Sequence, residues 1–192
     1  MTIPPRGTQA LLEAQARASA EHVILATVEL RHPAIVDDEG EPMAVRLVHD
    51  EGNLIEDGDP PIFGWQFGLE DDAPLDAGET VTFIACAFDV AVPDGTEGAP
   101  PRPTMSIDNV ANDIRRHVEA TLGTRAAIEV TYREYLLAEP GAPQRVQTGF
   151  TLPEVLVTHW RATGVLRLVD ALDRVYPGVV YDTRRFPALR GL

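Results

Sequence analysis

Residues 101–123, PRPTMSIDNVANDIRRHVEATLG, predict a short strand followed by an amphipathic helix, and the rest of the chain is organised around them. Asp108 and Asn109 are residue types that cap a helix, because their short side chains accept hydrogen bonds from the unpaired amides of the first turn. Gly123 provides a stop. The apolar residues in between recur every three to four positions, which predicts one packed and one exposed face. Taken alone, the stretch indicates a helix lying on a sheet.

The segments around this helix have the composition of strands. Residues 8–21 are rich in helix formers and predict a short N-terminal helix. β-branched or alternating apolar residues predict strands at 22–30, 43–49, 80–92, 104–107, 126–137, 146–152 and 154–162. His32 and Pro33 are expected to end the first strand. The strand at 126–137 alternates apolar and polar residues and is expected to be half exposed. Residues 165–176 fit strand or helix, and we expect a strand ending in a helical turn.

This pattern predicts a mainly β fold with flanking α elements. Seven or eight strands without regular helix alternation favour an antiparallel β-sandwich with one central packed helix and a short N-terminal helix. A chain of 192 residues fits one such domain, spanning residues 1–192. We expect that domain to carry a long acidic loop or flap at 50–78 and a C-terminal arm at 181–192.

Residues 50–78 interrupt the strand pattern with Asp, Gly and Pro around a short aromatic group. They fit a long loop or a β-flap with an aromatic anchor. Loops of this length are uncommon unless they have a function, so the segment is our first candidate for a partner contact, through Trp65, Phe67, Asp71 and Asp72. In the alternative interpretation the aromatic side chains only hold the loop on the protein's own core.

Two further groups of basic and aromatic residues are candidates for contacts with a neighbour. The arm, YDTRRFPALRGL, carries arginines beside an aromatic ring and can dock on another subunit, although chain ends often remain free. The central helix turns arginines outward. The candidate interface residues in these two segments are Arg115, Arg116, Arg184, Arg185 and Phe186.

Charge is unevenly distributed along the chain. Residues 1–101 hold 20 acidic and 4 basic side chains, and residues 102–192 hold 10 and 12, so the parts carry −16 and +2 within the total of −14. All 16 basic residues are arginine. This balance argues against nucleic-acid binding through a general basic surface. The acidic part is either a solvated surface, or a surface that meets a basic neighbour or keeps passing DNA from sticking.

The sequence contains no recognisable catalytic, cofactor or metal motif. Its one cysteine, Cys86, rules out an internal disulfide or a multi-cysteine cluster. The two serines lie outside any nucleophile elbow, phosphate-binding loops are absent, and the five histidines lack metal-ligand spacing. The acidic turns do not have the pattern of a calcium loop, and nothing singles out a glycosidase pair among the 30 acids. No apolar run is long enough for a bilayer and no signal peptide is evident, so membrane insertion is not expected.

Several blocks of the chain, in this order, resemble a family of tail proteins from long-tailed phages, many of which are labelled only as having unknown function. The blocks are ALLEAQARAS, VELRHPAI, MSIDNVANDIRRHV, VTYREYL and YDTRRFPAL, which together span most of the chain. The junction at Asp108, Asn109 and Val110 carries the most information. The section 50–78 departs from the resemblance.

The resemblance implies a structural protein of the virion tail tip, assembled in the host cytoplasm. Such a distal-tail or baseplate subunit is built on a β-sandwich and forms a ring, hexameric or alternatively trimeric, between the tail tube protein and the tail hub protein. Some hub proteins resemble iron–sulfur proteins with several cysteines. The single Cys86 favours the distal ring over that hub.

Two other function classes remain open at this point. A tail-associated hydrolase would need carboxylates clustered in a pocket and would lose activity when one of them is changed. A binding module or assembly chaperone would form no ring and would be missing from the finished particle.

Overall fold

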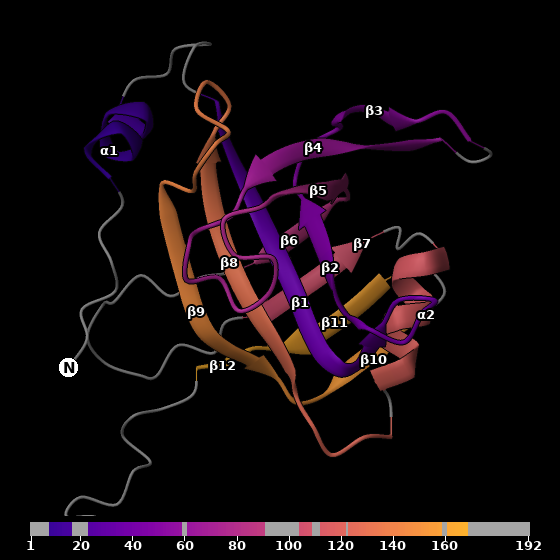
Figure 1. Ribbon diagram of the computed structural model, residues 1–192. Coiled ribbons are helices and arrows are strands. Elements are labelled where there is room, and N and C mark those ends of the chain that lie inside the picture. Colours follow the sequence, from indigo (N-terminus) through magenta and orange to yellow (C-terminus); the bar gives the residue numbers. More distant parts are fainter. Residues whose placement is uncertain are drawn as a thin grey trace, which may run out of the picture.

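The computed structural model describes residues 8–16, 23–58, 61–90, 104–108, 112–121, 123–158 and 161–168 (Figure 1). Over these residues the chain forms strands and two helices. In chain order they are α1 Gln9–Ala16, β1 Ile24–Val36, β2 Pro42–Val48, β3 Asn53–Glu56, β4 Ile62–Gly68, β5 Thr80–Ala85, β6 Phe88–Val90, β7 Thr104–Asp108, α2 Asn112–Thr121, β8 Ile128–Leu136, β9 Arg145–Leu152, β10 Val155–Val157, β11 Arg161–Val165 and β12 Arg167–Leu168.

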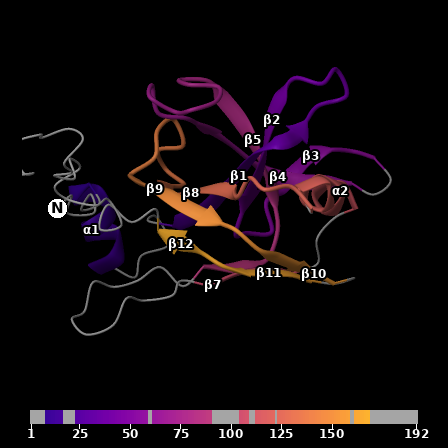
Figure 2. The ribbon, with the colours of Figure 1, turned by 90° about the horizontal axis from the view of Figure 1, so that it is seen from below.

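The strands form two sheets that pack face to face, which confirms the predicted mainly β fold with few helices (Figure 2). Sheet A has eight strands in the order β12-β9-β8-β1-β2-β5-β4-β3, and sheet B has four in the order β10-β11-β7-β6. The described pairs are antiparallel except β2–β5, which run parallel over two residue pairs. The prediction of an antiparallel arrangement is therefore wrong at this one pair.

The inner face of sheet A and the facing side of sheet B enclose an apolar core. Alternate residues of the central strands point into it, among them Val28 and Leu30 of β1 and Val130 of β8. Met105 and Ile107 of β7 meet them from sheet B. Val118 of α2 joins the same core, which confirms the predicted packed face of the helix. Each of these large side chains contributes roughly 1.5–3 kcal/mol through burial.

The outer face of sheet A is buried as well, under residues 69–79, which connect β4 to β5. This connection is an Ω-type loop whose ends meet, with the Leu69 amide donating to the Glu79 carbonyl at 2.9 Å. Thr131 and Arg133 of β8 lie beneath it and are buried. The expectation of a half-exposed strand at 126–137 is therefore wrong, because a distant loop covers its polar side.

Three predicted strands differ in their ends or continuity. β1 continues through His32 and Pro33 to Val36, because its pairing with β2 shifts register between Arg31 and Val36. The missing proline amide is tolerated at such an irregularity. The predicted strand at 80–92 divides at Cys86 and Ala87 into β5 of sheet A and β6 of sheet B. The predicted strand at 154–162 is likewise divided, into β10 and β11.

Both predicted helices are present in the part of the chain that the structure describes. Asp108 ends β7, in register with Arg161, and the predicted cap at Asp108 and Asn109 falls at residues 109–111, which lie outside the described residues. Gly123, two residues after the end of α2, has φ +82°, as expected for a residue that ends a helix. α1 rests its buried Leu11 against the rest of the protein. Neither described helix is long and apolar enough to cross a membrane.

Candidate interaction surfaces and a buried charge network

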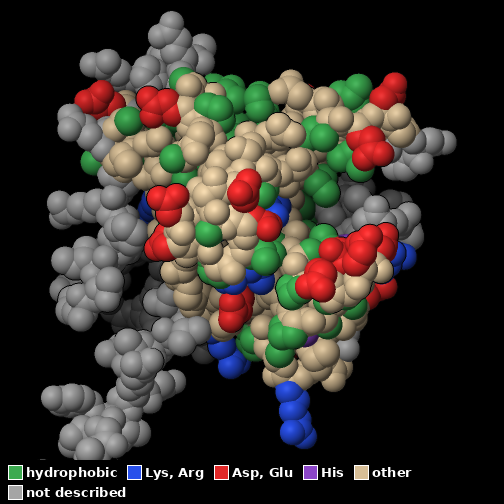
Figure 3. All heavy atoms as spheres, viewed as in Figure 1, with side chains coloured by type: hydrophobic (Ala, Val, Ile, Leu, Met, Phe, Trp, Pro, Cys, Tyr) green, Lys and Arg blue, Asp and Glu red, His purple; other side chains and the backbone are tan. Residues whose placement is uncertain are grey.

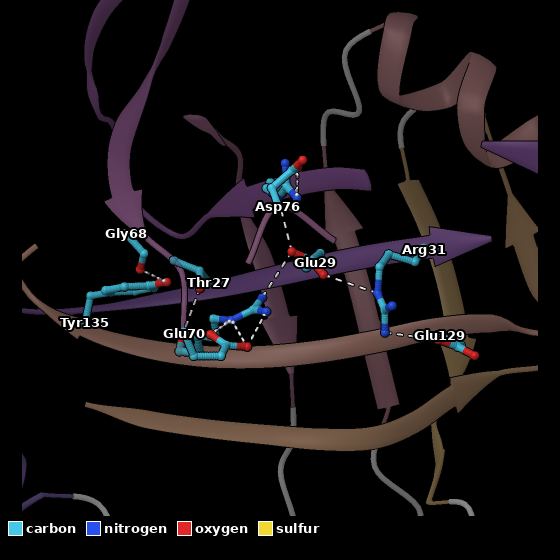
Figure 4. A network of polar contacts seen from close by, with 10 residues as sticks. Thr27, Glu29, Arg31, Gly68, Glu70, Asp76, Glu129 and Tyr135 are labelled. Atoms are coloured by element: carbon cyan, nitrogen blue, oxygen red, sulfur yellow. Dashed lines mark hydrogen bonds and ion pairs between the residues drawn. The ribbon is translucent and has the colours of Figure 1, made fainter. Parts of the chain in front are cut away.

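Glu29 lies at the centre of a charge network on the outer face of sheet A (Figure 4). Its fully buried carboxylate contacts three arginines. Arg46 Nε donates to Oε2 at 3.0 Å, Arg133 Nη1 donates to Oε2 at 3.3 Å, and Arg31 Nε lies 3.2 Å from Oε1. Strand register explains this gathering, because Arg46 is directly opposite Glu29 on β2 and Arg133 is opposite Thr27 on β8. Residues two apart on one strand share a face.

The network attaches the loop 69–79 to the sheet at two points. Arg133 forms a bidentate ion pair with Glu70, in which Nε donates to Oε2 at 2.8 Å and Nη2 donates to Oε1 at 2.7 Å. Arg46 Nη2 donates to Asp76 Oδ2 at 2.7 Å. Burial raises the pKa of Glu70, but the hydrogen bonds and charge of Arg133 outweigh it and leave that pKa below its usual value. The carboxylate therefore stays ionised and holds the loop in place.

An aromatic cluster continues the outer-face packing beside the charges. Phe67 of β4 stacks on Tyr135 of β8, with ring centroids 4.3 Å apart, and meets Phe83 of β5 edge to face at 5.6 Å. The Tyr135 hydroxyl donates to the Gly68 carbonyl at 3.1 Å, and burial raises its pKa. A Cβ on Gly68 would lie 2.1 Å from the Gly141 carbonyl oxygen, so only glycine permits this close approach.

The β3–β4 hairpin extends this apolar stripe away from the sandwich (Figure 1). Phe67, Trp65 and Phe63 alternate along one side of β4, and their burial falls from complete at Phe67 to 43% exposure at Phe63. Leu54 of β3 is directly opposite Phe63 and is 53% exposed. The structure thus presents an apolar pair, Leu54 and Phe63, near the end of the hairpin. We call this pair the hairpin face.

The base of the hairpin is tightly held. The Trp65 indole donates to Asp50 Oδ2 at 2.6 Å, and the Gly52 amide donates to the same oxygen at 3.2 Å. A Cβ on Gly64 would lie 2.1 Å from the Phe83 carbonyl oxygen, which shows how closely β4 and β5 approach. These contacts fix the direction in which the hairpin projects.

Sheet B carries a second exposed apolar group, on the side that faces away from the core. Leu156 of β10 is 68% exposed and Val165 of β11 is 45% exposed. Leu156 is opposite Thr163, so Val165 is its diagonal neighbour on the same face. Arg161 is exposed on that face, two residues before Thr163. We call Leu156, Arg161 and Val165 the sheet B face.

A third surface feature is an open groove of about 750 Å³ between β2, β5 and α2. Apolar residues of the two strands form its floor, and Arg116 and His117 of α2 form one wall. The acidic β1–β2 turn forms its rim, where Asp37 Oδ1 accepts hydrogen bonds from the Glu39 and Glu41 amides at 3.0 and 2.8 Å. Within the described residues, no group of three or more His, Cys, Asp or Glu could hold a metal ion.

Residues 10–181 match a protein family described as a domain of unknown function, DUF1833. The chain belongs to this family. The match includes all the described strands and α2, and therefore the charge network, the hairpin face and the sheet B face. No curated protein and no solved structure matches the chain.

The candidate interface residues of this DUF1833 protein lie in different places. Phe67 is fully buried and anchors the aromatic cluster, so its predicted role as a surface contact is wrong, and the alternative interpretation of an aromatic core anchor holds for it. Trp65 is half buried at the hairpin base. Asp71 and Asp72 are exposed on the loop 69–79.

The basic candidates do not join those acidic residues in one site. Arg115 of α2 lies 3.4 Å from Glu119 in an i, i+4 pair, and Arg116 lines the groove. Arg184, Arg185 and Phe186 lie outside the described residues.

Sequence reasoning missed the exposed partners that complete the two apolar faces. Leu54 stands in the short stretch NLIE, and Leu156 stands in VLV beside polar residues. Each of these strands is too short to show which side faces water, so only the strand pairing reveals it.

Proposed function

We propose that this DUF1833 protein is a structural subunit of a phage tail tip, one that assembles with copies of itself into a ring beneath the tail tube. Hexamers are our first expectation and trimers the second. The ordered sequence blocks that resemble tail proteins support this proposal, and the β-sandwich is the scaffold which that resemblance implies. The subunit would be assembled in the host cytoplasm and would contact the tube protein on one side and the hub protein on the other.

The observation that carries the ring is the pair of unlike apolar faces. The hairpin face lies at the outer end of sheet A, while the sheet B face lies on the other layer of the sandwich (Figures 1 and 2). A ring requires a heterologous contact, in which one surface of each subunit meets a different surface of the next. Two rigid and separate apolar faces on one chain provide such a pair.

The distribution of acidic side chains supports a channel for DNA. On one face of the molecule they gather over three segments, namely the loop 69–79, the β1–β2 turn and the β3–β4 hairpin (Figure 3). A negative surface repels the phosphate backbone and lets DNA pass without binding. We place this acidic face toward the ring channel, and a ring structure with these carboxylates on the outer rim would contradict that placement.

We assign the protein no catalytic role. Glu29, a fully buried carboxylate, is surrounded by three arginines, two of which also attach the loop 69–79. Such a cluster stabilises a fold and offers no open carboxylate pair for acid–base chemistry.

The mass of the purified protein tests the ring. Light scattering over a concentration series, with negative-stain images of the same fractions, should give closed particles of six or three subunits. A monomer at every concentration would contradict self-assembly.

Placement in the tail is tested separately, by deleting the gene from the phage genome that encodes the chain. The expected particles lack a finished tail tip and are not infectious, and a plasmid copy restores them. Complete infectious tails in the deletion strain would contradict a tail-tip role.

A further inference from the structure

We propose that the C-terminal arm of one copy, residues 181–192, adds to the open edge of β3 in the next copy as a further strand of sheet A. This inference rests on the proposed ring and adds a contact that the two apolar faces do not supply. It follows from the unpaired edge of β3, from the acidic charge around that edge, from the basic charge of the arm and from the order of the strands.

β3 is the last strand of sheet A. β4 pairs with one side of it through Asn53 and Leu54, and no described strand pairs with the other side, which we call the β3 edge. All four residues of β3 are exposed, and the hairpin extends away from the sandwich (Figure 1). The outward amides and carbonyls of such an edge form hydrogen bonds with an added strand. The β3 edge therefore fits an extended segment of chain.

The base of the hairpin holds this edge in a fixed direction. Asp50 Oδ2 accepts hydrogen bonds from the Trp65 indole at 2.6 Å and from the Gly52 amide at 3.2 Å. An edge that is ordered before binding loses little conformational entropy when a strand is added, which favours its use as a contact.

The charged side chains of the hairpin are all acidic. Glu51, Glu56 and Asp57 are exposed on it, and β4, the strand paired with β3, carries no charged residue. The sequence has no basic residue between Arg46 and Arg102. Two β3 edges would bring these acids together, so pairing between two hairpins is disfavoured. The charge of the β3 edge selects a strand with basic side chains.

The arm is the basic segment that the chain itself provides. Asp182 is its one acid, and no other segment outside the described residues holds more than one arginine. From residue 183 onward the arm has no acidic side chain. The arginines of the arm are Arg184, Arg185 and Arg190.

The apolar residues of the arm also suit an added edge strand. Phe186 can extend the apolar row of the hairpin beside Leu54, which is 53% exposed. Pro187 lacks an amide hydrogen and would weaken a central strand. In a strand at the edge of a sheet alternate amides point away from the partner, so a proline is tolerated there.

The order of the strands favours the next copy as the partner. The chain leaves its last described strand, β12, at one edge of sheet A, and β3 forms the opposite edge. Eight strands give seven spacings of about 4.8 Å, roughly 34 Å in all. An arm bound to its own copy would require residues 169–180 to run across the whole sheet. An arm bound to the next copy joins two unlike edges, which is the head-to-tail contact that a ring requires.

Charge reversal tests this contact in the full chain. One variant reverses the β3 edge, Glu56→Arg with Asp57→Arg, and the other reverses the arm, Arg184→Glu with Arg185→Glu. Each should weaken self-association by roughly tenfold or more and give monomers by light scattering where the wild type forms rings. The chain that carries all four substitutions again has opposite charges on edge and arm, and it should form rings.

The control makes the same change of charge elsewhere. Glu39→Arg with Glu41→Arg alters two exposed acids of the β1–β2 turn and should assemble as the wild type does. Rings from either reversed variant would overturn the arm contact and leave the ring standing. If both variants were monomers and the fourfold variant stayed monomeric, the pairing of edge and arm would be wrong. A monomeric wild type would overturn the ring and this contact with it.

Crosslinking shows which copy provides the arm. In a Cys86→Ala background, Asn53→Cys of β3 and Ala188→Cys of the arm are combined in one chain and treated with a short bis-maleimide. A ladder of covalent oligomers is expected. The matched chain has Leu12→Cys, at a 53% exposed position of α1, in place of Ala188→Cys and should give none. Crosslinks confined to single chains, equal ladders from both chains, or no crosslink at all would each overturn the proposed contact.

Discussion

The two faces of sheet A are packed by different means. The inner face meets a second sheet through aliphatic and aromatic side chains, and the outer face is covered by one loop that aromatic rings and paired charges hold. The inner core needs only two apolar faces of matching shape, because apolar packing has no required direction. The outer core depends on particular partners, since Glu29 and Arg133 are stable in a buried place only while they are paired. The comparison shows that the polar face of a strand such as β8 can be buried when a loop covers it and its charges are paired.

The largest expected effect is on the charge network. Arg133→Met removes the bidentate partner of Glu70 and one of the arginines around Glu29, and should cost about 3–5 kcal/mol of unfolding free energy. Urea denaturation measures it. Arg115→Met, which removes the surface pair with Glu119, is the control and should cost about 0.5 kcal/mol or less. Equal costs for the two variants would mean that the network does not hold the loop.

The second prediction concerns how the stability of the outer core depends on pH. The pKa of Glu70 is lowered by Arg133, so its ion pair stabilises the protein above the unfolded pKa, and this contribution is lost as pH falls through the lowered value. Stability should therefore decline as pH falls below about 4.5, the usual glutamate value. Glu70→Gln should cost roughly 1.5 kcal/mol at pH 7 and show a shallower decline. Identical pH profiles, measured by urea unfolding, would contradict the assignment.

A comparable effect is expected where the outer core meets the β8–β9 turn. Gly68→Ala places a Cβ against the Gly141 carbonyl and should cost about 1–3 kcal/mol through overpacking. Gly141→Ala is the matched control, because nothing lies within 4 Å of its added Cβ. Thermal unfolding compares the two variants, and a neutral Gly68→Ala would show that the turn can move away.

The smallest effect on stability is expected on the hairpin face. Phe63→Ala should change the unfolding free energy of the monomer by about 0.5 kcal/mol or less, since the ring is largely exposed there. Phe67→Ala, two residues along the same stripe, should cost about 3–5 kcal/mol. If chemical denaturation showed similar losses of unfolding free energy for both variants, Phe63 would belong to the core as Phe67 does, and this would contradict its assignment to an exposed face.

Local sequence patterns predicted the β-rich class, both helices and most of the strands, and they indicated a loop or a β-flap at 50–78, where the structure has β3, β4 and the loop 69–79. They could not predict that Thr80–Ala85 and Phe88–Val90 belong to different sheets, because the strand-forming residues continue through Cys86. They also missed the burial of Arg133. Its partners are 63 and 104 residues away along the chain, and no short-range pattern records such contacts.

The ring is tested most directly by electron microscopy of the purified assembly, averaged to a resolution at which strands can be traced. We expect a closed head-to-tail ring of six or three subunits, in which one surface of each subunit meets a different surface of the next. A two-fold dimer joined hairpin to hairpin would contradict both the heterologous contact and the ring built from it.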